Sequence, residues 1–110
     1  MTGFITYTDY GRMSVVFAKA DRPLRPTDDW MGGSAEDKVE ALDTFLAYAG
    51  TYDYDGERVT HHVEVCSFQN QVGHDLVRLV RFDGARVSLD TPPALLRGRL
   101  QTAHLVWERI

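Results

Sequence analysis

The fold of this chain is decided by the stretch Arg58-Val59-Thr60-His61-His62-Val63-Glu64-Val65-Cys66. Apolar residues occupy every second position, which is the period of a strand that is buried on one face. The predicted buried face consists of Val59, His61, Val63 and Val65. His61 is therefore a polar exception on an apolar face, whereas His62 and Glu64 on the other face should meet water.

Turn signals on both sides of this stretch divide the chain into further strands. Asp55-Gly56 and Asp83-Gly84 are dipeptides typical of tight hairpins, and Gly11 lies in a turn after the first strand. The predicted strands are residues 4–8, 13–18, 51–54, 57–66, 75–82, 85–89 and 100–109. Residues 21–33 contain two prolines and a glycine pair and are predicted to be a surface loop, and residues 91–98 a connection.

One segment has the periodicity of a helix. Residues 34–48 begin with Ser34, a favourable N-cap, and Gly50 suits the position after a helix end. An apolar stripe at steps of three and four residues consists of Val39, Leu42, Phe45, Leu46 and Ala49. Because an apolar stripe needs a surface to cover, we expect the helix to lie over one mouth or one side of the curled sheet.

The strand pattern favours a small antiparallel up-and-down β-barrel of about seven strands with one inserted α-helix. Closure into a barrel removes the exposed edges of a curled sheet. A two-layer sheet with the helix on one face is the alternative. The chain has 110 residues and a mass of 12.5 kDa, so we expect a single domain over residues 1–110 with one core.

The composition argues against several classes of function. Lys and Arg number 12 and Asp and Glu number 16, and this net charge of -4 is unfavourable for binding nucleic acid. Cys66 is the single cysteine and His61 and His62 point to opposite faces, so we expect no disulfide and no metal site. No apolar run is long enough to span a membrane and no signal-peptide pattern is present, so we expect a cytoplasmic protein without membrane contact.

A second polar residue is predicted to face the interior. In residues 75–82 the apolar face also carries Arg78, and symmetric pairing across the preceding loop places Val63 opposite Arg78 and His61 one diagonal step away. A buried guanidinium keeps its charge and requires an anion or several acceptors. The interior is therefore suited to a small ligand that carries a carboxylate or carbonyl group.

The candidate ligand-binding residues line this predicted interior. They are His61, Arg78, Tyr52, Tyr7, Met13 and Trp107. Structural roles remain open for all of them: Arg78 could pair with a carboxylate, and His61 could bond a backbone carbonyl. The carboxylates in question are Asp53, Asp75 and Glu64. The tyrosines, Met13 and Trp107 could simply be packing residues.

A family resemblance rests on the order of short segments along nearly the whole chain. The segments are Gly3-Phe4-Ile5-Thr6-Tyr7, Gly11-Arg12-Met13-Ser14-Val15, Arg22-Pro23, Tyr48-Ala49-Gly50-Thr51-Tyr52, Val59-Thr60-His61-His62-Val63-Glu64, Asn70, Gly73, Arg78 and Leu105-Val106-Trp107-Glu108-Arg109. Together they resemble the bacterial and fungal lipocalin-like domain family. The resemblance implies a small up-and-down barrel with an interior cavity. It also implies a link of some members to secondary metabolism, where such barrels bind or cyclise small hydrophobic intermediates.

The resemblance also implies that the usual first strand is lacking. Family members usually begin with an additional strand that carries a Gly-x-Trp-like segment, upstream of the part that matches residues 3–7. Arg109 matches the late arginine that commonly packs against that tryptophan, so its partner is missing here. An absent strand leaves an unpaired edge, and we therefore expect a homodimer through sheet edges.

Three functions are compatible with these features. The first, which we expect, is binding of a small hydrophobic or amphipathic ligand, with Arg78 facing an anionic or carbonyl group and His61 and Tyr52 as hydrogen-bond partners. The second is a cofactor-independent isomerase or cyclase for a secondary-metabolite intermediate, with His61 as acid or base and Arg78 stabilising an oxyanion. The third is a structural or interaction protein with a filled core. No pattern indicates a cofactor.

Overall fold

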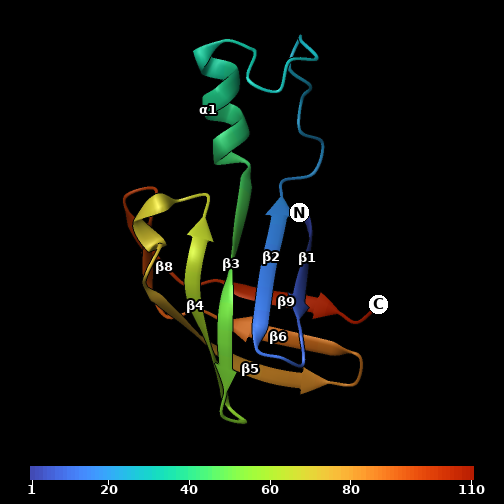
Figure 1. The fold of residues 1–110 in the computed structure, drawn as a ribbon, viewed down its shortest axis with the longest axis vertical. Coiled ribbons are helices and arrows are strands. Elements are labelled where there is room, and N and C mark those ends of the chain that lie inside the picture. Colours follow the sequence, from blue (N-terminus) through green and yellow to red (C-terminus); the bar gives the residue numbers. More distant parts are fainter.

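The computed structural model describes residues Met1–Ile110 and consists mainly of one curved antiparallel sheet (Figure 1). Its seven strands follow the order β1-β2-β3-β4-β5-β6-β9 and curl into a nearly closed barrel. The strands are β1 (Thr2–Tyr7), β2 (Arg12–Ala18), β3 (Phe45–Tyr54), β4 (Arg58–Cys66), β5 (Asp75–Asp83), β6 (Arg86–Asp90) and β9 (His104–Glu108). The predicted up-and-down barrel with one inserted helix is confirmed. No helix has the length and apolar character needed to cross a membrane.

A two-stranded hairpin lies outside this sheet and was predicted as a connection. It consists of β7 (Ala94–Leu96) and β8 (Arg99–Gln101). Arg97 and Gly98 between them have φ values of 51° and 78°, as a tight hairpin turn requires. Residues 100–109 are therefore not one strand, because the backbone of Ala103 is bonded to Thr91 instead of continuing the hairpin.

The helix is shorter than predicted. Helix α1 (Ala35–Asp43) begins with a capping box, in which the backbone N–H of Asp37 donates to Ser34 Oγ and that of Ser34 donates to the Asp37 carboxylate. It ends at Thr44, whose hydroxyl donates to the Glu40 carbonyl at 2.8 Å. Residues 45–48 belong to β3 because all four pair with β2, and from Tyr48 onward the strand also pairs with β4; this pairing outweighs a local helical period.

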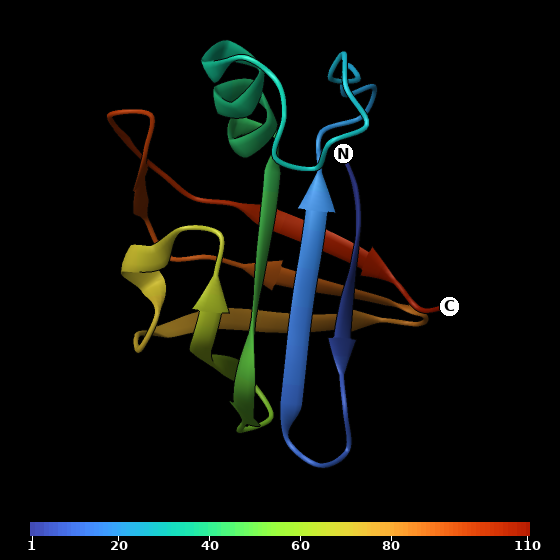
Figure 2. The ribbon, with the colours of Figure 1, turned by 45° about the horizontal axis from the view of Figure 1, so that its top comes forward.

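The helix does not cover the barrel, so the expectation about its position was wrong. Helix α1 stands beyond the first residue of β3, outside the sheet (Figures 1 and 2), and none of its residues is buried. Val39 and Leu42 are 58% and 61% exposed. The physical reason is that Phe45, Leu46 and Ala49, three members of the predicted stripe, lie in β3, so the remaining apolar surface of the helix is small.

The core occupies the concave side of the sheet, close to β2, β4 and β6. Its apolar members, each at most 4% exposed, are Met13, Val15, Val59, Val63 and Leu89. Arg78 pairs with Val59 and not with Val63 as predicted. The reason is the loop, where the short helix η1 (Gln69–Gln71) precedes a bond from Val63 N–H to the His74 carbonyl. His61 pairs with Leu76, so His61 and Arg78 still lie one diagonal step apart.

A β-bulge exchanges the two faces of β4 near its end. Ala49 pairs with Val65 but Gly50 pairs with Val63, which leaves Glu64 as the extra residue. Val65, predicted to be buried, is consequently 62% exposed. Cys66 pairs with Tyr48 and so shares its face, contrary to the simple alternation in the sequence.

The bulge depends on the glycine at position 50. A Cβ atom at Gly50 would lie 1.8 Å from the His62 carbonyl oxygen, whereas one at Gly56 would meet nothing within 4 Å. We expect Gly50→Ala to lower the free energy of unfolding by about 3 kcal/mol or more, through this backbone clash. Gly56→Ala, a control with φ of 95°, should cost only about 1 kcal/mol of strain. Urea denaturation measures both, and equal losses would contradict the argument.

Candidate functional site

The centre of the barrel holds a hydrogen-bonded chain of three side chains. His61 is fully buried. Its Nε2 atom lies 2.6 Å from the hydroxyl of Tyr7 on β1, and its Nδ1 atom lies 2.8 Å from the hydroxyl of Tyr48 on β3. Three strands thus place one imidazole between two phenols, and no carboxylate touches it.

Burial sets the protonation of this Tyr7–His61–Tyr48 chain. Desolvation, with a smaller contribution from the charge of Arg78, lowers the pKa of His61 to about 4. Burial raises the pKa of Tyr7 and Tyr48 above the usual value, although Arg78 opposes both increases. All three members of the chain are therefore neutral near pH 7. A neutral chain is better suited to hydrogen bonding than to ionic acid–base chemistry.

Arg78 is the charged group nearest to this chain, and it has no carboxylate partner. It is half-buried on β5, and its Nη1 atom donates to the backbone carbonyl of Val77 at 3.1 Å. Its charge acts on Tyr7, Tyr48 and His61. A half-buried guanidinium that faces only neutral groups retains unused donors for an anion or a carbonyl.

The carboxylates considered as partners of Arg78 are bound elsewhere, on the convex face. His62 contacts Asp53 and Asp75, each at 2.7 Å, and these hydrogen bonds raise its pKa. Glu64, the bulge residue, pairs with Arg12 at 2.6 Å. The alternation of β4 thus separates two neighbouring histidines: His62 belongs to an exposed ionic cluster, and His61 to an uncharged interior.

The other predicted site residues lie on both sides of the Tyr7–His61–Tyr48 chain. The Tyr52 ring packs edge-on against Tyr7 at 4.8 Å, and its hydroxyl donates to the Thr8 carbonyl. Met13 is buried and pairs with Tyr7. Trp107 lies on β9 and contacts Phe17 of β2 across the barrel, with ring centroids 6.4 Å apart. The structure therefore brings Tyr52 and Met13 next to Tyr7 and places Trp107 at the last strand.

Tyr48 belongs to the Tyr7–His61–Tyr48 chain but is absent from the site that the sequence predicts. It lies at the end of the predicted helix, residues 34–48. Tyr48, Gly50 and Tyr52 alternate with Ala49 and Thr51. This period of two is the signal that could have assigned the segment to a strand and placed Tyr48 on the same face as Tyr52.

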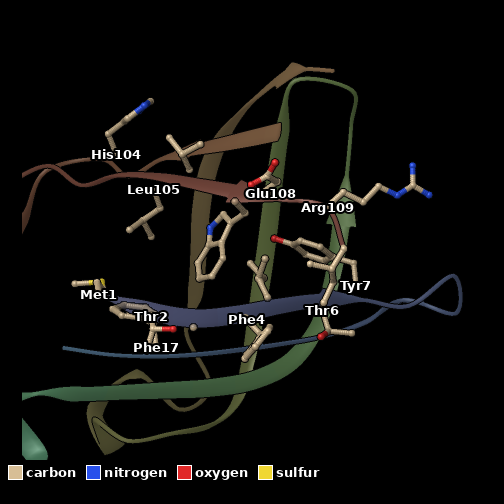
Figure 3. Close-up of a pocket in the computed structure, with 15 residues that line it drawn as sticks. Met1, Thr2, Phe4, Thr6, Tyr7, Phe17, His104, Leu105, Glu108 and Arg109 are labelled. Atoms are coloured by element: carbon tan, nitrogen blue, oxygen red, sulfur yellow. The ribbon is translucent and has the colours of Figure 1, made fainter. Parts of the chain in front are cut away.

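A cleft of about 650 Å³ opens between β1 and β9, the two edges of the sheet (Figure 3). Every neighbouring pair of strands is antiparallel, so these two edges run in the same direction, and no ladder joins them. Tyr7 and Leu105 point into the opening, whereas His104 and Arg109 point away from it. Trp107 also lines the cleft. This lateral opening connects the interior with solvent.

The arrangement favours binding of a small polar-tipped molecule over metal chemistry. No group of three His, Cys, Asp or Glu side chains could hold a metal ion. The interior instead combines aromatic rings, hydrogen-bonding hydroxyls and one cation. Such a mixture of apolar walls and a few polar groups is typical of sites for small organic ligands.

Comparisons with known proteins agree with this geometry. A family described as "Lipocalin-like domain" matches residues 1–110. The chain is also similar to a protein of Aspergillus oryzae named 4'-hydroxy-3'-methoxypropiophenone carrier protein. The identity is 26% over 107 residues, covering 89% of this chain and 96% of the fungal protein. No solved structure matches significantly.

The buried His61 should make stability depend on pH. The unfolded chain binds a proton at His61 near the ordinary pKa of 6.5, but the folded protein only near 4. Acidification from pH 6.5 to 4 therefore favours unfolding, by up to about 3 kcal/mol from this residue. Denaturant titrations at several pH values should give a smaller slope of unfolding free energy against pH for His61→Gln than for the parent protein. Equal slopes would rule out the neutral buried imidazole.

Proposed function

This chain belongs to the lipocalin-like domain family, and from that premise we propose that it is a carrier that binds a small hydrophobic or amphipathic ligand in its barrel. The observation that carries the proposal is the half-buried Arg78, which faces an uncharged interior without a carboxylate. A ligand with an anionic or carbonyl oxygen satisfies such a group. The fungal relative, named as a carrier of an aryl ketone, supports the same class of role.

The proposed binding site retains all residues chosen from the sequence. They are His61, Arg78, Tyr52, Tyr7, Met13 and Trp107. In this proposal Arg78 faces the polar end of the ligand, and His61 acts by holding the hydroxyls of Tyr7 and Tyr48, since both ring nitrogens are bonded to them. Tyr52, Met13 and Trp107 form apolar walls.

The wider assignment follows from the same site. We propose that residues 1–110 act as one ligand-binding domain in the cytoplasm, without cofactor, nucleic acid or membrane partner. The name of the fungal relative describes a phenolic ketone. We propose for this chain a ligand of that class, an intermediate of secondary metabolism.

Replacement of Arg78 tests the proposal. The parent protein should bind 4'-hydroxy-3'-methoxypropiophenone, measured by isothermal titration calorimetry, and Arg78→Ala should weaken this affinity about tenfold because a charge-assisted hydrogen bond is lost. Arg81→Ala is the matched control, since Arg81 is an exposed arginine on the same strand. Equal affinity of the parent and Arg78→Ala would reject the role of Arg78.

A cofactor-independent isomerase or cyclase is the second candidate, favoured by the continuous Tyr7–His61–Tyr48 chain, which could relay a proton. The low pKa of His61 and the raised pKa of both tyrosines weaken them as base and acids, which is why we rank binding first. Deuterium uptake beside the carbonyl of the same ketone in D₂O, followed by NMR, separates the two. Uptake that His61→Gln leaves unchanged would remove His61 from any catalysis.

We also propose a homodimer through the open sheet edges. The unpaired outer sides of β1 and β9 expose backbone donors and acceptors, and such edges pair readily with another chain. A two-fold axis next to β1 would join two copies in antiparallel fashion. Phe4 on the convex face of β1 is 59% exposed and would lie near that axis.

Light scattering after gel filtration tests the dimer. The parent should have twice the chain mass of 12.5 kDa. Phe4→Lys should give the monomer, because lysine protects an edge strand from pairing. The matched control is Val16→Lys, on the strand position that pairs with Phe4 inside the sheet. A monomer mass at every concentration of the parent would contradict the dimer.

A further inference from the structure

The Tyr7–His61–Tyr48 chain contains more hydrogen-bond donors than it uses. A neutral imidazole has one N–H donor and one acceptor nitrogen. One tyrosine therefore donates its O–H to His61, and the other accepts the N–H of His61 on its oxygen. The O–H of that second tyrosine is left over. A charged imidazole would leave both hydroxyl protons over, so at least one free phenolic donor exists in either state.

Tyr7 is the member of the chain that can present this donor to a ligand. Tyr7 lines the cleft between β1 and β9, and Tyr48 does not. The hydroxyl of Tyr7 bonds only His61, since the neighbouring Tyr52 donates to the Thr8 carbonyl. When His61 donates from Nε2, the O–H of Tyr7 is therefore directed to whatever occupies the space beside it.

Trp107 supplies a second unused donor on the opposite side of the same cleft. Its indole Nε1 atom is sealed from solvent, and no protein atom accepts its hydrogen. An unsatisfied buried donor costs about 1–3 kcal/mol, so native proteins seldom retain one without a partner. The ring of Trp107 lines the cleft and packs edge-on against Phe17.

We propose that Tyr7 and Trp107 form a recognition pair for the carbonyl group of a flat aromatic ketone held in the cleft between β1 and β9. The inference rests on the carrier function and adds the two residues that recognise the carbonyl group of the ligand. Tyr7 and Trp107 both line one space of about 650 Å³ with aromatic walls. Neutral donors select a carbonyl oxygen over a methylene group, while the walls hold the ring.

A pair of compounds that differ only in the carbonyl group tests this assignment. 2-Acetylnaphthalene contains the C=O group and 2-ethylnaphthalene has CH₂ in its place. We expect the parent protein to bind the ketone about tenfold more tightly than the hydrocarbon, as one or two buried hydrogen bonds predict. In ¹H–¹⁵N spectra of the parent, the ketone alone should shift the indole resonance of Trp107. Trp30, which is 88% exposed, is the internal control.

Matched variants assign the donors. Tyr7→Phe and Tyr48→Phe each remove one hydroxyl from His61, but only Tyr7→Phe should reduce the preference for the ketone, to about threefold. Trp107→Phe should reduce it similarly, and Trp30→Phe should not. The spectra of the parent protein keep the test valid where a variant fails to fold.

The outcomes separate this inference from the carrier function. Equal affinity for both compounds, without a selective shift of the Trp107 resonance, would overturn the recognition pair and leave the carrier function standing. Failure of the parent to bind either compound would also overturn the recognition pair, and failure to bind 4'-hydroxy-3'-methoxypropiophenone as well would overturn the carrier function. An equal loss of preference in Tyr7→Phe and Tyr48→Phe would show that the chain as a whole, and not Tyr7, provides the donor.

Discussion

The burial of one uncharged imidazole between two phenols is the interaction on which the interior depends. His61 has no contact with solvent, and its two nitrogens are bonded to hydroxyls from β1 and β3. Because both partners are neutral, the group adds no charge to the core and ties three strands together. An unpaired imidazole at this depth would lose these bonds without compensation from water. The same arrangement leaves Arg78 as the charged group nearest to the uncharged interior.

The position of this chain depends on a backbone irregularity as well as on the side chains. The bulge at Glu64 and the absence of a side chain at Gly50 let β3 and β4 approach closely and alter the faces of β4 beyond Val63. Upstream of the bulge His61 faces inward, and downstream of it Cys66 shares the face of Tyr48. The close approach of β3 and β4 at Gly50 therefore positions the Tyr7–His61–Tyr48 chain and also contributes to the stability of the sheet.

The barrel is open on one side, between β1 and β9. An odd number of antiparallel strands brings two edges of the same direction together, and these cannot form the antiparallel ladder used everywhere else in the sheet. The result is an opening lined by Tyr7 and Trp107. The helix does not close the barrel, since it stands beyond the sheet (Figure 2). The interior is thus open at the side between β1 and β9.

The amino-acid sequence by itself determined most strands of the curved sheet, the hairpins at Asp55-Gly56 and Asp83-Gly84, and the inward position of His61 and Arg78. These features depend on alternation and turn chemistry, which are local. The tertiary structure decided the end of the helix, the register opposite Arg78 and the partnership of Tyr48 with His61. They depend on ladders between strands distant in sequence. In residues 45–48, pairing with β2, joined by β4 from Tyr48 onward, overrides the helical period that these residues show on their own.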